Sequence, residues 1–427
     1  MYKRKDRKTL PLLPELFPFG GKLDENNRWL RISELLPWEE LEDEYGRYFS
    51  AVGCPAKDAQ LVIGLLLLKH MSGLSDADVV LAVRENPYMQ AFCGFEHFVT
   101  SDILDSSSLT KVRKRLGVKF FRQLEEKTYR VLIERKIIKA KGMLVDATVF
   151  PEHIKYPHDV GLLNDVRGWL VDNIKKLGTA VGRTYRTYCR VARREYLNFS
   201  KKKKKSKKAI SKAKKQMLQY VRRNLNQFKE VIEERKAKGY EVKQKIIERL
   251  RVVEEIYRQH LYMYKQKVNR MKERIVSFHR PYVRPIKRGK LAQVGKFLFL
   301  DYFQHEAFSE AELAEQQLKA YEERFGKLPP YFTADRKYGT RDNRRLLEEY
   351  GVRPCFKPLG RKAKLEHKDE RWFKRKQKER NRIEGSFGNG KQHYGLDRVR
   401  YSIKNGSEMW IRAGILAMNL KTAAKRS

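Results

Sequence analysis

A long basic stretch interrupts the strand-forming pattern of this 427-residue chain. From about Val166 to Arg274 the sequence is typical of long helices rich in lysine and arginine, with little strand signal. Residues 167–290 hold about 39 basic and about 10 acidic side chains, roughly two thirds of the net charge of +42. Short apolar, β-prone runs lie on both sides of this stretch. The pattern therefore predicts an α/β domain that is split by a helical insertion.

The charge excess of the whole chain predicts a polyanionic partner. Its 94 Lys and Arg residues outnumber 52 Asp and Glu residues, and such a field attracts the phosphate backbone of nucleic acids. Ribosomal proteins, histone-like proteins and nucleic-acid enzymes share this property, so charge alone leaves the chemistry open. The run Lys201–Lys208 is explained nearly as well by a solvated basic tip as by contact with a nucleic-acid backbone, and it carries no sequence readout.

Cysteine usage and the apolar runs bear on the cellular compartment. The four cysteines form no Cys-x-x-Cys pair, so we expect reduced thiols in a cytosolic protein and neither zinc ligands nor disulfides. No stretch approaches 18 consecutive apolar residues, and the basic amino terminus is not followed by a secretory apolar run. We therefore expect no signal peptide, no membrane span and a cytoplasmic, nucleoid-associated protein.

The first part of the chain predicts a helical domain. Pro55 opens an apolar helix, Gly73 breaks it and Ser75 caps the next helix. This pair could be a helix-turn-helix reader, but the second helix is acidic at its start and apolar after it, which favours core packing. A better DNA-facing candidate is the helix after Asp105, although a solvated basic face explains it equally well. Its polar and basic residues are Thr110, Lys111, Arg113, Lys114 and Arg115.

Two aspartates are delivered by predicted strands. Asp146 lies in the middle of the apolar run 142–150, and Asp335 ends the short strand 331–335. An acid inside a strand core is costly without partners, so Asp146 is either a hydrogen-bonded structural residue or a functional one aimed into a cleft. Acids delivered by separate elements suit a site for two Mg²⁺ ions, but sequence order alone does not select these acids among 52.

A third acid, Glu384, lies in a late basic helix. Arg380 precedes it by one turn, and Lys391 follows it by seven residues on the same face. One carboxylate between two cations suits a metal site that also grips phosphates, whereas a mixed-charge surface helix explains the spacing without any function. Three glycines in this helix would each cost roughly 1 kcal/mol relative to alanine. They are Gly385, Gly388 and Gly390.

Several linked segments resemble the DDE transposases of bacterial insertion sequences, within the insertion-sequence-five superfamily. The segments, in order, are Asp146–Thr148, Tyr156–Arg167, Pro281–Lys290, Thr333–Gly339 and Asn381–Lys391. The amino-terminal runs Phe17–Leu23, Asn27–Trp29 and Glu85–Tyr88 are similar to the helical domain that usually precedes that catalytic core. The likeness covers nearly the whole chain.

The resemblance implies an α/β (α+β) fold with a ribonuclease H-like mixed sheet and flanking helices, preceded by an all-helical domain. It implies a helical DNA-binding domain over residues 1–138, a catalytic domain over 139–165 and 276–427, and a basic helical insertion over 166–275. These boundaries leave the three acids on one catalytic domain.

The resemblance also implies that Asp146, Asp335 and Glu384 are the catalytic, metal-binding triad, with two Mg²⁺ ions for which Mn²⁺ can substitute. The family signature around the glutamate also contains an arginine and a lysine, at the spacing of Arg380 and Lys391. The tyrosine of that signature is replaced by a glutamine, Gln377. His153 and His158 lie near the first acid, but Mg²⁺ prefers oxygen, so we leave them out of the site.

The implied function is that of a DNA transposase, which cuts a strand at the transposon end and joins the freed 3′-hydroxyl to target DNA by metal-dependent phosphoryl transfer. Arg380 and Lys391 would hold phosphates beside the acids, and Lys111, Arg113 and Arg115 would contact DNA. The partners would be double-stranded DNA and further copies of the chain in a homodimer or larger synaptic multimer. A transposase-derived DNA-binding protein that does not cut, and a ribonuclease H-like nuclease that does not join, are the alternatives.

Overall fold

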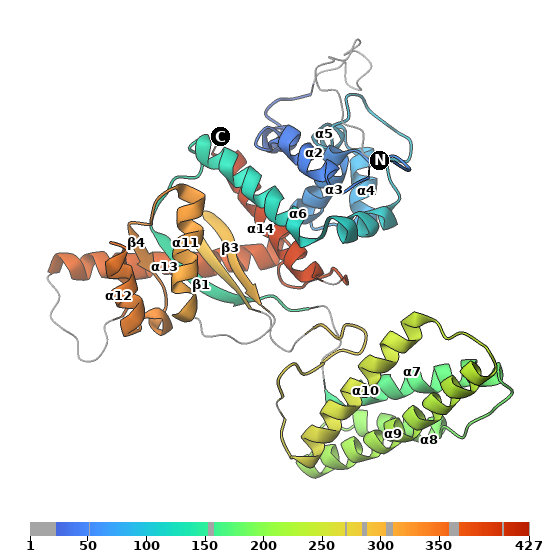
Figure 1. The fold of residues 1–427 in the computed structure, drawn as a ribbon. Coiled ribbons are helices and arrows are strands. Elements are labelled where there is room, and N and C mark those ends of the chain that lie inside the picture. The colour runs from blue at the N-terminus through green and yellow to red at the C-terminus, as the bar shows by residue number, and fades with distance from the viewer. Residues whose placement is uncertain are drawn as a thin grey trace. The chain divides into compact units, whose positions relative to one another are not determined.

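The computed structural model describes residues 23–50, 52–152, 158–269, 271–283, 288–304, 311–357, 367–403 and 405–426. Most of the run Phe17–Leu23, His153, Tyr156 with Pro157, and residues 284–287 lie outside them. The chain divides into two compact units, Met1–Glu152 with Lys287–Ser427, and His153–Ile286 (Figure 1). Among the described helices none has the length and apolar character needed to cross a bilayer.

From residue 23 onwards, where its described part begins, the first unit starts with a group of helices. They are α1 (Arg28–Ser33), α2 (Trp38–Gly46), α3 (Ala59–Ser72), α4 (Asp76–Glu85), α5 (Pro87–Phe92) and α6 (Ser106–Glu134). Asp58 caps α3, Gly73 ends it in the left-handed conformation, and Ser75 with Asp78 forms a capping box at α4. α3 is buried along almost its whole length, and α4 buries its apolar side. The pair is therefore part of the core, as the sequence predicts.

α6 consists of two helical segments. Asp105 caps its start by accepting a hydrogen bond from the backbone N–H of Ser107 (2.7 Å). Gly117 has φ of 62° and ψ of −173°, so the helix is interrupted there by a non-helical residue. Beyond it, Phe120, Phe121 and Leu124 are buried. The second segment thus packs in the helical core and ends at Glu134.

A five-stranded mixed sheet forms the second part of this unit. Its strands are β1 (Met143–Val149), β2 (Arg288–Val294), β3 (Phe297–Gln304), β4 (Tyr331–Thr333) and β5 (Arg353–Cys355). Their order is β3-β2-β1-β4-β5. The pairs β1–β2 and β2–β3 are antiparallel, whereas β1–β4 and β4–β5 are parallel. Together with its flanking helices, the sheet gives the ribonuclease H-like α/β arrangement that was predicted.

β2 is a strand that the sequence analysis did not identify. It was hidden because polar residues, including Lys290 and Gln293, interrupt its apolar pattern. Gly295, with φ of 63°, and Lys296 turn the chain from β2 into β3. The hairpin places β2 between β3 and the strand that carries Asp146.

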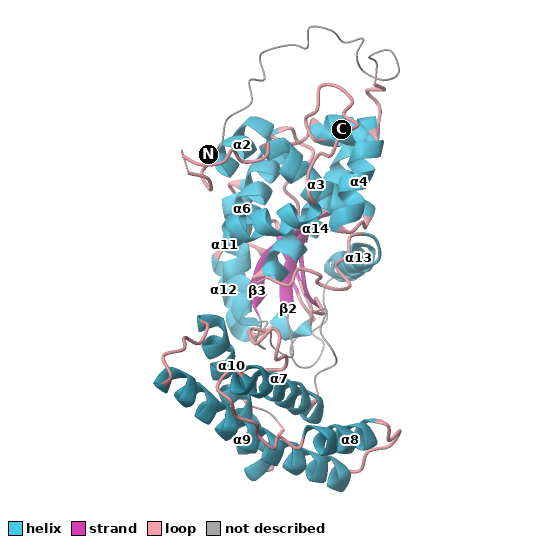
Figure 2. Cartoon of the chain, turned by 90° about the vertical axis from the view of Figure 1, so that its right-hand side faces the viewer, coloured by secondary structure: helices cyan, strands magenta, loops and turns pink. Residues whose placement is uncertain are grey.

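Helices cover both sides of the sheet. Figure 2 shows α13 (His367–His393) on one side, with α11 (Ala314–Phe325) and α12 (Arg341–Glu349) on the other. α13 contacts β1, β4 and β5. The helix that carries Glu384 therefore crosses the strands that deliver the two aspartates.

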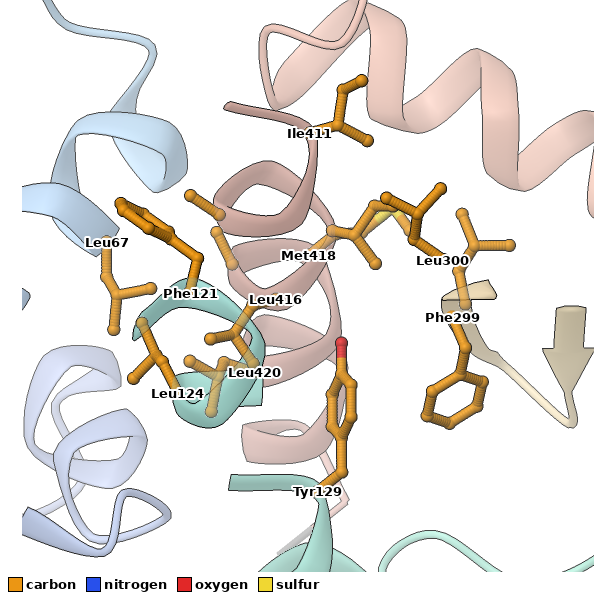
Figure 3. Packing of buried hydrophobic residues seen from close by; sticks show 14 of the residues in the cluster. Leu67, Phe121, Leu124, Tyr129, Phe299, Leu300, Ile411, Leu416, Met418 and Leu420 are labelled. Carbon is orange, nitrogen blue, oxygen red and sulfur yellow. The ribbon is translucent and has the colours of Figure 1, made fainter. Parts of the chain in front are cut away.

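The last helix, α14 (Gly406–Ala424), joins the helical part to the sheet. It packs against α3 and α6 and against β3 (Figure 3). The buried amide of Asn419 donates to the carbonyl of Leu298 (2.6 Å) and to the hydroxyl of Tyr129 (3.0 Å), and it accepts from the N–H of Leu298 (3.0 Å). The helices and the sheet consequently share one hydrophobic core. No role for this helix was predicted from the sequence.

The second unit consists of helices in the part of it that the structure describes. They are α7 (Asp159–Thr179), α8 (Cys189–Ser200), α9 (Lys207–Ala237) and α10 (Gln244–Lys265). Apolar residues of α7, α9 and α10, among them Leu170, Phe228 and Ile256, form its core. Most of the run Lys201–Lys208 connects α8 to α9, as predicted, and its side chains are exposed.

Candidate active site

Two of the three acids lie on neighbouring parallel strands, just beyond the residues that pair β1 with β4. In the pairing of β1 with β4, Leu144 is opposite Thr333. Asp146 and Asp335 each follow two residues later, and Asp335 keeps an extended backbone with φ of −72° and ψ of 176°. Because side chains alternate along an extended chain, both aspartates project from the same face at the same level. The fold thus brings together two acids that are far apart in sequence.

The surroundings of Asp146 oppose its negative charge. Burial raises the pKa of the Asp146 carboxyl, and neighbouring Asp335 raises it further, against the effects of the Ala147 N–H, Arg380 and Lys290. Lys290 is fully buried opposite Ala147, with its ammonium 4.6 Å from the centre of the Tyr338 ring. A cation that bound here would relieve the repulsion between the two carboxylates. Sequence reasoning missed Lys290, since nothing in its pattern marks it as buried.

α13 brings a guanidinium to the same place. Arg380 Nη1 lies 3.0 Å from Asp146 Oδ2, and Arg380 Nη2 lies 3.5 Å from Glu384 Oε1. The Arg380 and Asp146 side chains are 22% and 19% exposed, whereas that of Glu384 is 59% exposed. Glu384 is therefore at the rim of the site and is connected to Asp146 through Arg380.

The arrangement can be compared with what a divalent cation requires. Within the described ranges no three His, Cys, Asp or Glu side chains are close enough together to hold a metal ion as they stand. Asp146 and Asp335 nevertheless offer neighbouring carboxylate oxygens, the ligands that Mg²⁺ prefers, and one Asp335 oxygen also accepts from the N–H of Lys337 (3.0 Å). The two aspartates suit such a cation, and Glu384 would join them by giving up its contact with Arg380.

The helix around Glu384 continues through its glycines. α13 ends at His393, so Lys391 lies on the helix and not in a turn. Lys391 lines a hollow of about 180 Å³ together with Lys69 and Arg400. A Cβ at Gly390 would lie 2.8 Å from Leu396 Cδ1, whereas one at Gly385 or Gly388 would meet nothing within 4 Å. Of these three glycines, only Gly390 therefore has a close neighbour among the described residues.

The glutamine at the position of the family's tyrosine is bound to the sheet. Gln377 Nε2 donates to the backbone carbonyl of Cys355 (2.7 Å) at the end of β5 and lies 3.8 Å from Cys355 Sγ. All four cysteines are free thiols in the structure. His158 accepts from the N–H of Gly161 (3.1 Å) and caps α7, which is a structural role.

One residue proposed to contact DNA is buried. Lys111 and Arg115 are exposed on α6, but the Arg113 side chain is 4% exposed and donates to both carboxylate oxygens of Asp76. Its guanidinium also lies 4.2 Å from the centre of the Tyr401 ring. The prediction that Arg113 contacts DNA is therefore wrong, because spacing along α6 does not reveal a carboxylate on α4.

Comparisons with known proteins match both parts of the first unit. A family model described as "Transposase domain (DUF772)" matches residues 17–115, and one described as "Transposase DDE domain" matches residues 332–421. A protein of Rhizobium meliloti, "Uncharacterized protein ORF8 in nfe locus", is 33% identical over 159 residues, which cover 36% of this chain and 77% of that protein. No solved structure gives a significant match. The second model spans Asp335, Glu384 and Lys391, and the chain belongs to the DDE transposases of bacterial insertion sequences.

Proposed function

We propose that this transposase binds transposon ends and catalyses metal-dependent cleavage and transfer of DNA strands. The observation that carries the proposal is the alignment of Asp146, in the middle of β1, with Asp335, just after β4. Arg380 links Asp146 to Glu384 there. A paired carboxylate site beside a guanidinium suits phosphoryl transfer, in which the protein mainly supplies position and charge.

Each side chain has a separate role in this proposal. Asp146, Asp335 and Glu384 would hold two Mg²⁺ ions, or Mn²⁺ in their place, and such ions would supply Lewis-acid stabilisation of the attacking and leaving oxygens. Arg380 exchanges its carboxylate partners for phosphate oxygens, which its planar fork can contact in pairs. Lys391 holds a phosphate further along the helix.

DNA would also contact regions beyond the acids. Lys111 and Arg115 are exposed on α6, and we propose that they contact DNA from the amino-terminal domain, residues 1–138. The lysines between α8 and α9 in the insertion are exposed and would track the backbone without reading its sequence. Because two transposon ends must be held together, we propose a homodimer or larger synaptic multimer that works in the cytoplasm on nucleoid DNA.

The decisive experiment incubates the protein with a labelled transposon end, a target plasmid and Mg²⁺. We expect joined product from the parent protein and none from Asp146→Asn, Asp335→Asn or Glu384→Gln. The matched control, Glu349→Gln, removes an exposed carboxylate on α12 and should leave joining unchanged. Cleavage by all three acid variants would overturn the proposed roles.

The products distinguish the alternatives. Nicked DNA without joining would identify a nuclease, and DNA that is shifted but intact would identify a binding protein that does not cut. Mn²⁺ binding, followed by electron paramagnetic resonance without DNA, gives a second readout. The acid variants should bind Mn²⁺ at least tenfold more weakly than Glu349→Gln does.

A further inference from the structure

Two adjoining hollows lie beside α13, away from the carboxylates. The first, of about 480 Å³, is lined by Gly142 at the start of β1, Tyr331 at the start of β4 and the β2–β3 turn. The second, of about 640 Å³, continues past the end of α14, and the two share Lys296 and Arg426. We call the pair the α13 groove. It lies towards the amino ends of β1 and β4, whereas Asp146 lies in the middle of β1 and Asp335 beyond the end of β4.

The α13 groove and the acids lie largely on different sides of α13. Arg382 lines the first hollow and Asn389 the second. With about 100° of rotation per residue, these positions are about 200° and 180° around the helix from Arg380, which contacts Asp146. Lys376 and Glu379 also line the first hollow and lie about 40° and 100° from Arg380, so this hollow reaches round towards the acids without including any of the three in its lining.

The groove is strongly and almost uniformly basic. Among the lining residues, the single acid is Glu379, and it is already paired with Lys376 (3.0 Å). The other lining cations include Lys139, Lys141, Lys296, Arg382, Lys425 and Arg426. No ion pair joins any of these six to another residue in the part of the chain that the structure describes. Their charges are consequently available to an anion.

The cations also repel one another. Lys421 lines the second hollow, and its pKa is lowered by burial and then by the charges of Arg28 and Lys425. Like charges gathered in this way raise the free energy of the unbound protein, and a polyanion lowers it again. The α13 residues from Arg382 to His393 extend over about 16 Å, which exceeds the size of a single phosphate ion.

We propose that the α13 groove binds the phosphate backbone of double-stranded DNA at a place separate from the strand held by the carboxylates. The inference rests on the proposed function, because it assumes that the partner is DNA. The contact is with phosphates, so it does not depend on base sequence. It supplies a second hold on DNA from the same helix that carries Arg380 and Glu384.

The test compares two triple variants that remove the same charge. The groove variant is Lys141→Gln/Lys296→Gln/Lys425→Gln, and the control is Lys57→Gln/Lys119→Gln/Lys327→Gln, whose lysines line neither hollow. Binding of a random-sequence duplex is measured over a range of salt concentrations. Each lost phosphate contact lowers the slope of log K against log salt by about 0.9. We expect a decrease of about 2 to 3 for the groove variant and little change for the control.

Two outcomes would overturn the inference. The groove variant could keep the parental slope, or both triple variants could lose the same amount, which would indicate an effect of net charge alone. Thermal unfolding of both variants checks that the fold is intact. Strand joining is measured separately: a lowered slope together with an inactive parent protein would support the groove and refute the catalytic proposal, and an unchanged slope together with normal joining would do the reverse.

Discussion

Replacing Arg113 by glutamine should destabilise the first unit without removing a DNA contact. Arg113 and Lys69 both donate to Asp76, and their side chains are 4% and 8% exposed. The cluster ties α3, α4 and α6 to Tyr401, which precedes α14. Lys111, two residues earlier on α6, is exposed and provides the matched comparison.

The expected magnitude follows from this geometry. Removing one member of a buried ion pair costs about 3–5 kcal/mol. Asp76 is 23% exposed and keeps Lys69 as a partner, so we expect the lower end of that range, about 3 kcal/mol. Lys111→Gln should change the free energy of unfolding by less than about 0.5 kcal/mol. It should instead lower the salt slope of DNA binding by about 0.9.

The pH dependence provides an internal check. Burial raises the pKa of Asp76, but the hydrogen bonds from Arg113 and Lys69 outweigh it, so the folded-state pKa lies below the ordinary aspartate value of 3.8. The stability that Asp76 contributes is therefore present above pH 3.8 and is lost as the pH falls through the folded-state pKa. In Arg113→Gln this loss should begin at a higher pH.

Urea unfolding monitored by tryptophan fluorescence measures the stability, and titration of a duplex at several salt concentrations measures the DNA contact. Trp410 reports on the cluster directly, because the Lys69 ammonium lies 5.3 Å from the centre of its ring. If Arg113→Gln were as stable as the parent and lowered the salt slope as Lys111→Gln does, Arg113 would face DNA and the assignment to the core would be wrong.

Three further changes test the site and its support. The pKa of Asp146 is raised in the folded protein, so the protonated carboxyl stabilises the fold, and this contribution to the free energy of unfolding is lost as the pH rises through that pKa. Asp146→Asn should flatten the fall in the free energy of unfolding, measured by urea unfolding between pH 4 and 8. The same substitution should abolish joining. Asn419→Leu leaves the N–H and carbonyl of Leu298 without their buried side-chain partner and should cost about 2–5 kcal/mol in the same measurement; a neutral result would contradict the role of this amide. In Gly388→Ala the new methyl group meets open space, so this variant should stabilise α13 by up to about 1 kcal/mol. In Gly390→Ala the methyl group would lie 2.8 Å from Leu396, so this variant should gain less stability or lose some. Equal effects of the two variants in thermal unfolding would refute the contact with Leu396.

The elements that carry the acids are predictable because their signals are local. An apolar run with one acid marks β1 around Asp146, and a short strand before Asp335 marks β4. The spacing of Arg380 and Glu384 likewise follows from helical periodicity. Each of these patterns is complete within a few residues.

The features that escaped prediction depend on partners that are distant in sequence. β2 contains Lys290, whose burial is explained only by the sheet around it and by the ring of Tyr338. Arg113 has the sequence pattern of a surface cation, yet Asp76 on another helix takes it into the core. No local pattern distinguishes a charge that faces solvent from one that meets an opposite charge across the fold.

The position of α13 links the two proposals mechanically. From Lys376, which lines the α13 groove, to His393, the helix rises about 26 Å. At 3.4 Å per base pair along each strand, this corresponds to roughly eight base pairs of duplex. Between these ends Ile383 is fully buried and anchors the helix. Because one anchored helix carries both sites, DNA held in the groove would fix the distance from its phosphates to Arg380 and Glu384. The groove variant should therefore join long duplexes less efficiently than the parent protein does, and the difference should grow with the length of duplex that lies in the groove. Duplexes too short to reach the groove should be joined equally well by the parent protein and the groove variant.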